Sequence, residues 1–178
     1  MIANLLQEYS ERIPLIGHFE LTHKCPFKCA FCYNHVKAIP ELSTKEVFNI
    51  IDQVVDLGCM YINFSGGEPL LRKDFNDIYF YTKKKGVHVS LETNIYYIPN
   101  GLIELIKEYP VDNFNISLYG LDDKSFQLVT RSKNDFKRVL NNLDTLLKEG
   151  IEFQLRTPIS KDVLPHNSPD AVPGGRCF

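Results

Sequence analysis

Five segments of this chain alternate apolar and polar residues, and helical patterns lie between them. The alternating segments are residues 15–22, 60–64, 87–91, 113–118 and 151–156. Strands that are separated by helices pair in parallel, because a right-handed crossover returns the chain to the same end of the sheet. The sequence therefore predicts an α/β fold with about five parallel strands.

The alternation also predicts how the sheet is covered. Val89 and Leu91, for example, alternate with Ser90 and Glu92, and the other strands follow the same rule. Helices on both faces would bury a polar side chain at every second position, at about 1–3 kcal/mol for each one left unpaired. We therefore expect helices on one face only, as in a partial (β/α)6-type barrel with a polar interior. An open sheet with one solvated face is the alternative.

Four helices are expected from local signals. Ser43 and Glu46 form a capping box at the start of a helix over 44–57, which ends at Gly58. A second helix follows residue 72 and ends in three lysines, where cations suit the helix dipole. The others span 101–109 and 135–149, and the last one places a set of apolar residues on one face: Phe136, Val139, Leu140, Leu143 and Leu147.

Length and composition define the class of protein. A chain of 178 residues favours one domain, which we place at 13–157 between an N-terminal segment (1–12) and an irregular tail (158–178) that contains four prolines. A net charge of −2 indicates no nucleic-acid partner. No apolar stretch is long enough for a membrane span, and the polar N-terminus does not resemble a secretory signal. We expect a cytoplasmic protein.

Three cysteines, Cys25, Cys29 and Cys32, lie within eight residues directly after the first strand. Three thiolates on one short loop can bind three irons of a cubane and leave the fourth iron open, whereas most electron-transfer clusters use four cysteines. The alternative is a structural zinc site with His23 or His35 as the fourth ligand. The isolated Cys59 is interpreted as a small buried apolar residue.

The cysteine spacing Cx3CxxC, with Phe31 before the last cysteine, resembles the radical S-adenosylmethionine (SAM) superfamily. The sequence Gly66-Gly67-Glu68-Pro69 after the second strand is similar to the GGEP motif of that family. The resemblance covers residues 13 to about 157 and implies a [4Fe–4S] cluster on the three cysteines. It also implies an enzyme that reductively cleaves SAM to methionine and a 5′-deoxyadenosyl radical.

The resemblance further implies which residues bind SAM. Gly66 and Gly67 permit close backbone approach, and Glu68 accepts hydrogen bonds from the SAM ammonium group. Ser117 contacts the ribose, and Arg131, placed in a loop, pairs with the carboxylate. Phe31 lies against the adenine. Thr93-Asn94 resembles the TNG segment of the family, with Ile95 in place of the glycine.

The form of these motifs is most similar to the peptide-modifying branch, which often carries a second cysteine-rich domain. Only five strands and no second cysteine cluster are present, so the chain resembles a truncated form. We expect a small-molecule or peptide substrate, an external electron donor, and an exposed sheet edge or a partner chain beside the last strand. The alternatives are a non-catalytic SAM-binding remnant and a zinc-stabilised binding module. Candidates for facing substrate from the polar interior are His88, Glu92, Asn115 and Arg156.

Overall fold

The computed structural model describes residues 13–34 and 40–158, so the segment 1–12 and the tail from residue 159 lie outside the described residues. Five strands form one parallel sheet in the order β1-β2-β3-β4-β5, which confirms the predicted fold class. Their bounds are β1 (Ile16–Glu20), β2 (Tyr61–Ser65), β3 (His88–Thr93), β4 (Asn113–Ser117) and β5 (Gln154–Arg156).

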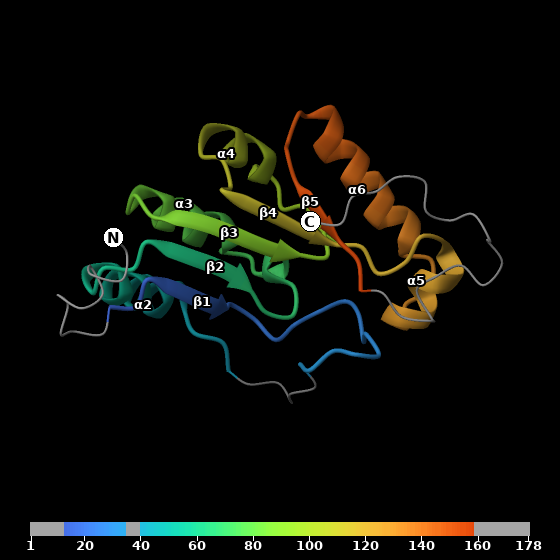
Figure 1. Ribbon diagram of the computed structural model, residues 1–178, viewed down its shortest axis with the longest axis horizontal. Coiled ribbons are helices and arrows are strands. Elements are labelled where there is room, and N and C mark those ends of the chain that lie inside the picture. The colour runs from blue at the N-terminus through green and yellow to red at the C-terminus, as the bar shows by residue number, and fades with distance from the viewer. Residues whose placement is uncertain (1–12, 35–39, 159–178) are drawn as a thin grey trace, which may run out of the picture.

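The helices cover one side of this sheet (Figure 1). They are α2 (Thr44–Asp56), η1 (Pro69–Leu71), α3 (Phe75–Lys84), α4 (Leu102–Glu108), α5 (Asp123–Thr130) and α6 (Phe136–Lys148). The core lies between the two layers, where Phe64, Leu91 and Ile116 are fully buried. No helix in the described part of the chain is both long and apolar enough to span a bilayer.

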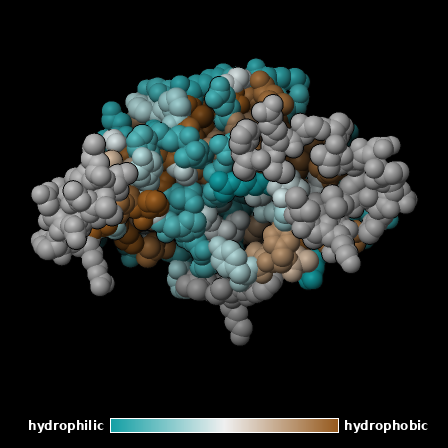
Figure 2. Space-filling model, viewed as in Figure 1, coloured by the Kyte–Doolittle hydropathy of each residue, from teal (hydrophilic) through white to brown (hydrophobic). Residues whose placement is uncertain are grey.

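The other side of the sheet is polar, as the alternation predicts. The strand register places His18 beside Asn63 and Glu92 beside Asn115, so polar side chains form rows across neighbouring strands. Figure 2 shows hydrophilic residues across the middle of this face. Polar groups that face one another can satisfy each other's hydrogen bonds without a covering layer.

Two elements differ from the sequence prediction. Helix α5 occupies a region where only a loop was expected, and its N-cap is Asp122, whose side chain accepts a hydrogen bond from the Ser125 N–H. An aspartate three residues before a serine, followed by Phe126 and Val129, is the local signal that was missed. Strand β5 contains only three residues, half the predicted length, and all three are exposed.

The apolar face of α6 is rotated from the predicted one. Val139, Leu143 and Leu146 are buried, whereas Leu140 and Leu147 are 41% and 65% exposed. The short strand β5 offers little sheet for this side of the helix to cover. No sixth strand pairs with β5 among the described residues, and residues 159–178 lie outside them, so the predicted exposed edge stays a prediction.

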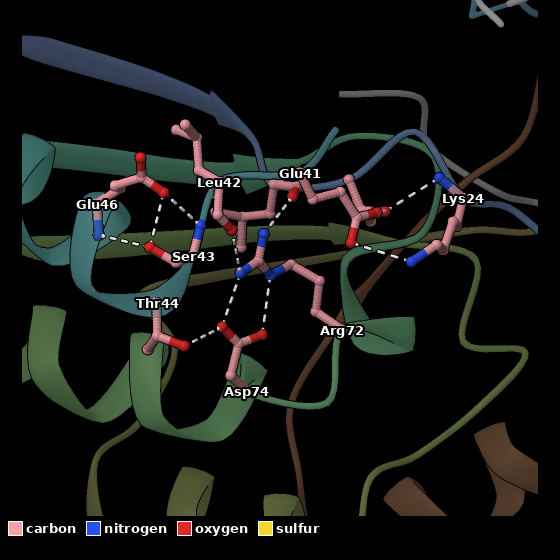
Figure 3. Close-up of polar contacts among 10 residues, drawn as sticks. Lys24, Glu41, Leu42, Ser43, Thr44, Glu46, Arg72 and Asp74 are labelled. Carbon is pink, nitrogen blue, oxygen red and sulfur yellow. Dashed lines mark hydrogen bonds and ion pairs between the residues drawn. The ribbon is translucent and has the colours of Figure 1, made fainter. Parts of the chain in front are cut away.

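Arg72 connects the sheet to the segment that leads into α2 and to the start of α3 (Figure 3). Its guanidinium donates to both oxygens of Asp74, at 2.9 and 2.7 Å, and to the Leu21 carbonyl oxygen at 2.9 Å. A further bond reaches the Leu42 carbonyl oxygen at 3.1 Å. The Arg72 side chain is only 6% exposed, so these bonds form in a low-dielectric setting and fix the end of β1.

The loop after β2 packs directly against the chain that follows β1. The Gly67 N–H donates to the Thr22 carbonyl oxygen at 2.7 Å, and the Glu68 N–H donates to the Lys24 oxygen at 2.8 Å. A Cβ atom on Gly67 would lie 2.8 Å from the His23 oxygen and closer still to the Lys24 oxygen, and both are backbone atoms that cannot rotate away. Glycine is therefore required for this approach.

Replacing Arg72 by alanine should lower the free energy of unfolding by about 3 kcal/mol, because it leaves the Asp74 carboxylate without its cation. Urea denaturation of the full chain measures this change. The matched control is Lys148→Ala, which removes an exposed pair with Asp144 and should cost no more than about 0.5 kcal/mol. Equal effects of the two substitutions would contradict the proposed role of Arg72.

Gly67→Ala should displace the chain that leads to the cysteines, because the added carbon overlaps backbone atoms. It should lower the free energy of unfolding by at least about 2 kcal/mol. The control is Gly86→Ala, where φ is +77° but no atom lies within 4 Å of the added carbon. Amide chemical shifts of residues 23–32 should change in Gly67→Ala and remain unchanged in Gly86→Ala. Unchanged shifts in both variants would argue against the close contact.

Candidate cofactor site

The three clustered cysteines lie on the loop that leaves the carboxyl end of β1. Two backbone bonds hold this loop against α5: Lys28 N–H donates to the Thr130 oxygen and Ala30 N–H to the Val129 oxygen, both at 2.9 Å. The last carbonyl groups of a helix have no partner within the helix. Helix α5 therefore supports the cysteine loop by using acceptors that its own geometry leaves free.

The thiols differ in exposure: Cys25 is exposed, Cys32 is intermediate and Cys29 is buried. Desolvation raises the pKa of the Cys25 thiol to about 11 and that of Cys29 to about 12, and the neighbouring cysteines add to both shifts. Without a metal, both groups are therefore protonated at neutral pH. Metal binding at these sulfurs must release protons, as is usual for thiolate sites.

A hollow of about 460 Å³ opens beside this loop. The three cysteines line it together with residues that the sequence assigned to SAM: Phe31, Gly66, Gly67 and Arg131. Arg131 follows the last residue of α5 in a left-handed conformation, with φ of 57°. The missed helix is thus the element that brings Arg131 to the cysteines. Tyr119, which sequence reasoning did not single out, lies in the same wall and packs against Phe31 at 5.8 Å between ring centroids.

Glu68, which the sequence also assigned to SAM, lies outside this hollow. Its carboxylate is fully buried and does not line the hollow. It accepts hydrogen bonds from Leu70 N–H at 3.0 Å, from the Thr93 hydroxyl at 2.6 Å and from Asn94 N–H at 2.7 Å. Burial raises the pKa of Glu68 to about 7, although these three donors oppose the rise. In the structure Glu68 joins the loop after β2 to the loop after β3.

The loop after β3 has an unusual backbone. Ile95 stands at the position of the glycine in the TNG segment. It adopts a left-handed φ of 51° and is fully buried. β-branched residues rarely take this conformation, so the turn needs support from its surroundings. The Thr93 hydroxyl accepts from Ile95 N–H at 2.9 Å, and the Asn142 amide of α6 donates to the Ile95 oxygen at 2.7 Å. The segment keeps the turn without the glycine.

A second hollow, of about 430 Å³, lies over the polar face of the sheet. It shares Tyr33, Gly66, Gly67 and Tyr119 with the first, so the two hollows are neighbours across the glycine loop. Its other walls come from the five strands and from the start of the loop after β3: His18, Asn63, Ser65, Glu92, Thr93, Asn94, Ser117 and Arg156. Ser117, expected at the ribose, therefore lies in this hollow and not beside the cysteines.

The four candidates for the polar interior separate into two groups. Glu92 and Arg156 line the second hollow and form an ion pair at 2.8 Å. The buried Asn115 donates a hydrogen bond to Glu92 at 3.0 Å. His88 lies at the opposite end of β3, where it pairs with Asp112 at 2.7 Å and stacks on Tyr61. It does not reach either hollow.

The donor set can be compared with both metal interpretations. Among the described residues, no group of three or more His, Cys, Asp or Glu side chains is arranged to bind one metal ion. A zinc site gathers all its ligands around one ion, whereas a cubane binds each thiolate through a different iron. His23 lines the hollow, but His35 lies outside the described residues. Three free thiols around one hollow fit a cluster with an open corner.

Comparisons with known proteins identify the family of the chain. A model of the radical SAM superfamily matches residues 19–163. Fe-coproporphyrin III synthase of Methanosarcina barkeri is 32% identical over 162 residues, which are 89% of this chain and 40% of that protein. PqqA peptide cyclase of Granulibacter bethesdensis is 30% identical over 106 residues, which are 58% of this chain and 28% of the cyclase.

The fold has solved counterparts. The structure of SuiB of Streptococcus suis bound to its precursor peptide SuiA matches with a TM-score of 0.72 and 20% identity, over 86% of this chain and 35% of that one. The chain thus spans less than half the length of these relatives. The family model covers most of the chain, including the cysteine, GGEP and Arg131 segments, and it confirms the resemblance found in the sequence. The chain belongs to the radical SAM superfamily.

Proposed function

We propose that this chain is a radical SAM enzyme domain, spanning residues 13–157, that binds a [4Fe–4S] cluster through Cys25, Cys29 and Cys32. The observation that carries the proposal is the shared hollow, in which three free thiols, the glycine loop and Arg131 meet. Each cysteine would bind one iron, and the fourth iron would stay open for the amino and carboxylate groups of SAM. When bound and reduced, the cluster supplies the electron that cleaves SAM to methionine and a 5′-deoxyadenosyl radical.

The residues of the chain would bind and orient SAM. The backbone of Gly66 and Gly67 offers polar groups between the two hollows, and Arg131 offers a cation for the carboxylate. Phe31, 55% exposed and braced by Tyr119, provides an apolar surface for adenine. Ser117 in the second hollow would meet the ribose. We assign Glu68 a positioning role, because its carboxylate is enclosed and fixes the glycine loop.

The second hollow is the proposed substrate site. A peptide is the favoured substrate, because a peptide cyclase is among the relatives and a solved counterpart binds a precursor peptide. The paired Glu92 and Arg156 offer an acceptor and a donor side by side, which suits the amide groups of a peptide. An external electron donor would reduce the cluster in the cytoplasm. A partner chain could complete the barrel at β5.

The first test uses Cys29→Ala, with Cys59→Ala as its control. Cys59 is also buried, but its thiol contacts the Tyr61 carbonyl oxygen at the start of β2. After anaerobic reconstitution, Cys29→Ala should lose most of its iron and all formation of 5′-deoxyadenosine under a strong reductant, while Cys59→Ala keeps both. Zinc without iron in the native chain would overturn the proposal. Iron and SAM binding without product would favour the non-catalytic remnant.

The second test concerns Arg131. Arg131→Gln should weaken SAM binding at least tenfold, because a charge-assisted hydrogen bond contributes about 1.5–3 kcal/mol. Equilibrium dialysis with radiolabelled SAM on the cluster-loaded chain measures the dissociation constant. Lys133→Gln, two residues further along and outside both hollows, removes the same charge and should leave it unchanged. Equal losses in both variants would assign the effect to general electrostatics.

A further inference from the structure

Asn94 makes a contact with the cysteine loop that the proposed function does not use. Its side-chain amide nitrogen Nδ2 lies 3.6 Å from the Cys25 sulfur, within hydrogen-bond range for a sulfur acceptor. Asn94 follows β3 and is only 4% exposed. The two residues are 69 positions apart in the sequence, so this is a tertiary contact between two loops at the carboxyl ends of the strands.

The orientation of the Asn94 amide is fixed by a second bond. Its Oδ1 accepts the Tyr96 N–H at 3.0 Å, so the nitrogen must be the atom that faces the sulfur. The Asn94 backbone N–H donates to Glu68 at 2.7 Å, and Asn142 donates to the Tyr96 oxygen at 3.1 Å. Hydrogen bonds on both sides of Asn94 thus hold the turn that carries the amide.

The contact makes the three cysteines unequal. The Cys25 sulfur accepts hydrogen bonds from the Asn94 amide and from the Phe27 backbone N–H. Within the described residues, no side chain donates a hydrogen bond to Cys29 or Cys32. A donor beside a thiolate stabilises its negative charge. Hydrogen bonds to cysteine sulfurs are one of the means by which proteins set cluster potentials.

We propose that Asn94 is a positioning residue that donates a hydrogen bond to the Cys25 ligand and raises the reduction potential of the cluster. This inference rests on the proposed function, since it requires the cluster. The reduced cluster carries one more electron than the oxidised one, and part of that charge resides on the sulfurs. The Asn94 donor therefore stabilises the reduced state more than the oxidised state.

Two variants remove the donor in different ways. Asn94→Ser keeps an oxygen that can accept the Tyr96 N–H but cannot reach the sulfur. Asn94→Leu keeps the side-chain volume and removes both bonds. The midpoint potential of the reconstituted full chain, without SAM, is measured by electron paramagnetic resonance during titration with dithionite. We expect a more negative potential in both variants and a smaller fraction of reduced cluster at a given dithionite concentration.

The matched control is Asn142→Ala, which removes two bonds to the same turn without touching a sulfur. It should keep the wild-type potential, so a shift equal to that of Asn94→Ser would mean that the turn and not the donor is responsible. Unshifted potentials in the Asn94 variants that load the cluster would overturn this inference alone. A wild-type chain that assembles no cluster would overturn the proposed function and this inference with it.

Discussion

The buried carboxylate of Glu68 is the interaction on which the site depends. It holds the loops that follow β2 and β3 together, because three donors from those loops converge on it. Through Gly67 the first loop contacts the chain behind β1, and through Asn94 the second contacts Cys25. An enclosed carboxylate without these donors would be costly, so the three bonds favour the arrangement in which the loops after β2 and β3 meet.

The one-sided sheet explains why both hollows lie where they do. Parallel strands end together, so their loops gather at one edge, and the face without helices gives those loops an adjoining polar surface. The cysteine loop is supported from the far side by α5, which supplies free carbonyl groups and carries Arg131 at its end. A cofactor and its substrate can then share the walls formed by the glycine loop.

Much of this arrangement could be predicted from the sequence because its signals are local. Alternation revealed the strands and their polar face, and Ser43 with Glu46 marked the start of α2. Helix α5 was missed because its short apolar pattern is weak. The length of β5 was overestimated because it depends on pairing with the neighbouring strand. The burial of the Glu68 carboxylate and the contact between Asn94 and Cys25 depend on segments that are distant in the sequence. No local pattern predicts such contacts.

The shortness of β5 bears on how the chain behaves in solution. Within the described residues, β5 pairs only with β4, so the backbone groups on its outer side have no partner strand among them. Long, flat strands at such an edge promote self-association and aggregation. Three residues, one of them the charged Arg156, give a second molecule little to align with. The short strand thus offers few backbone groups with which a second copy of the chain could pair.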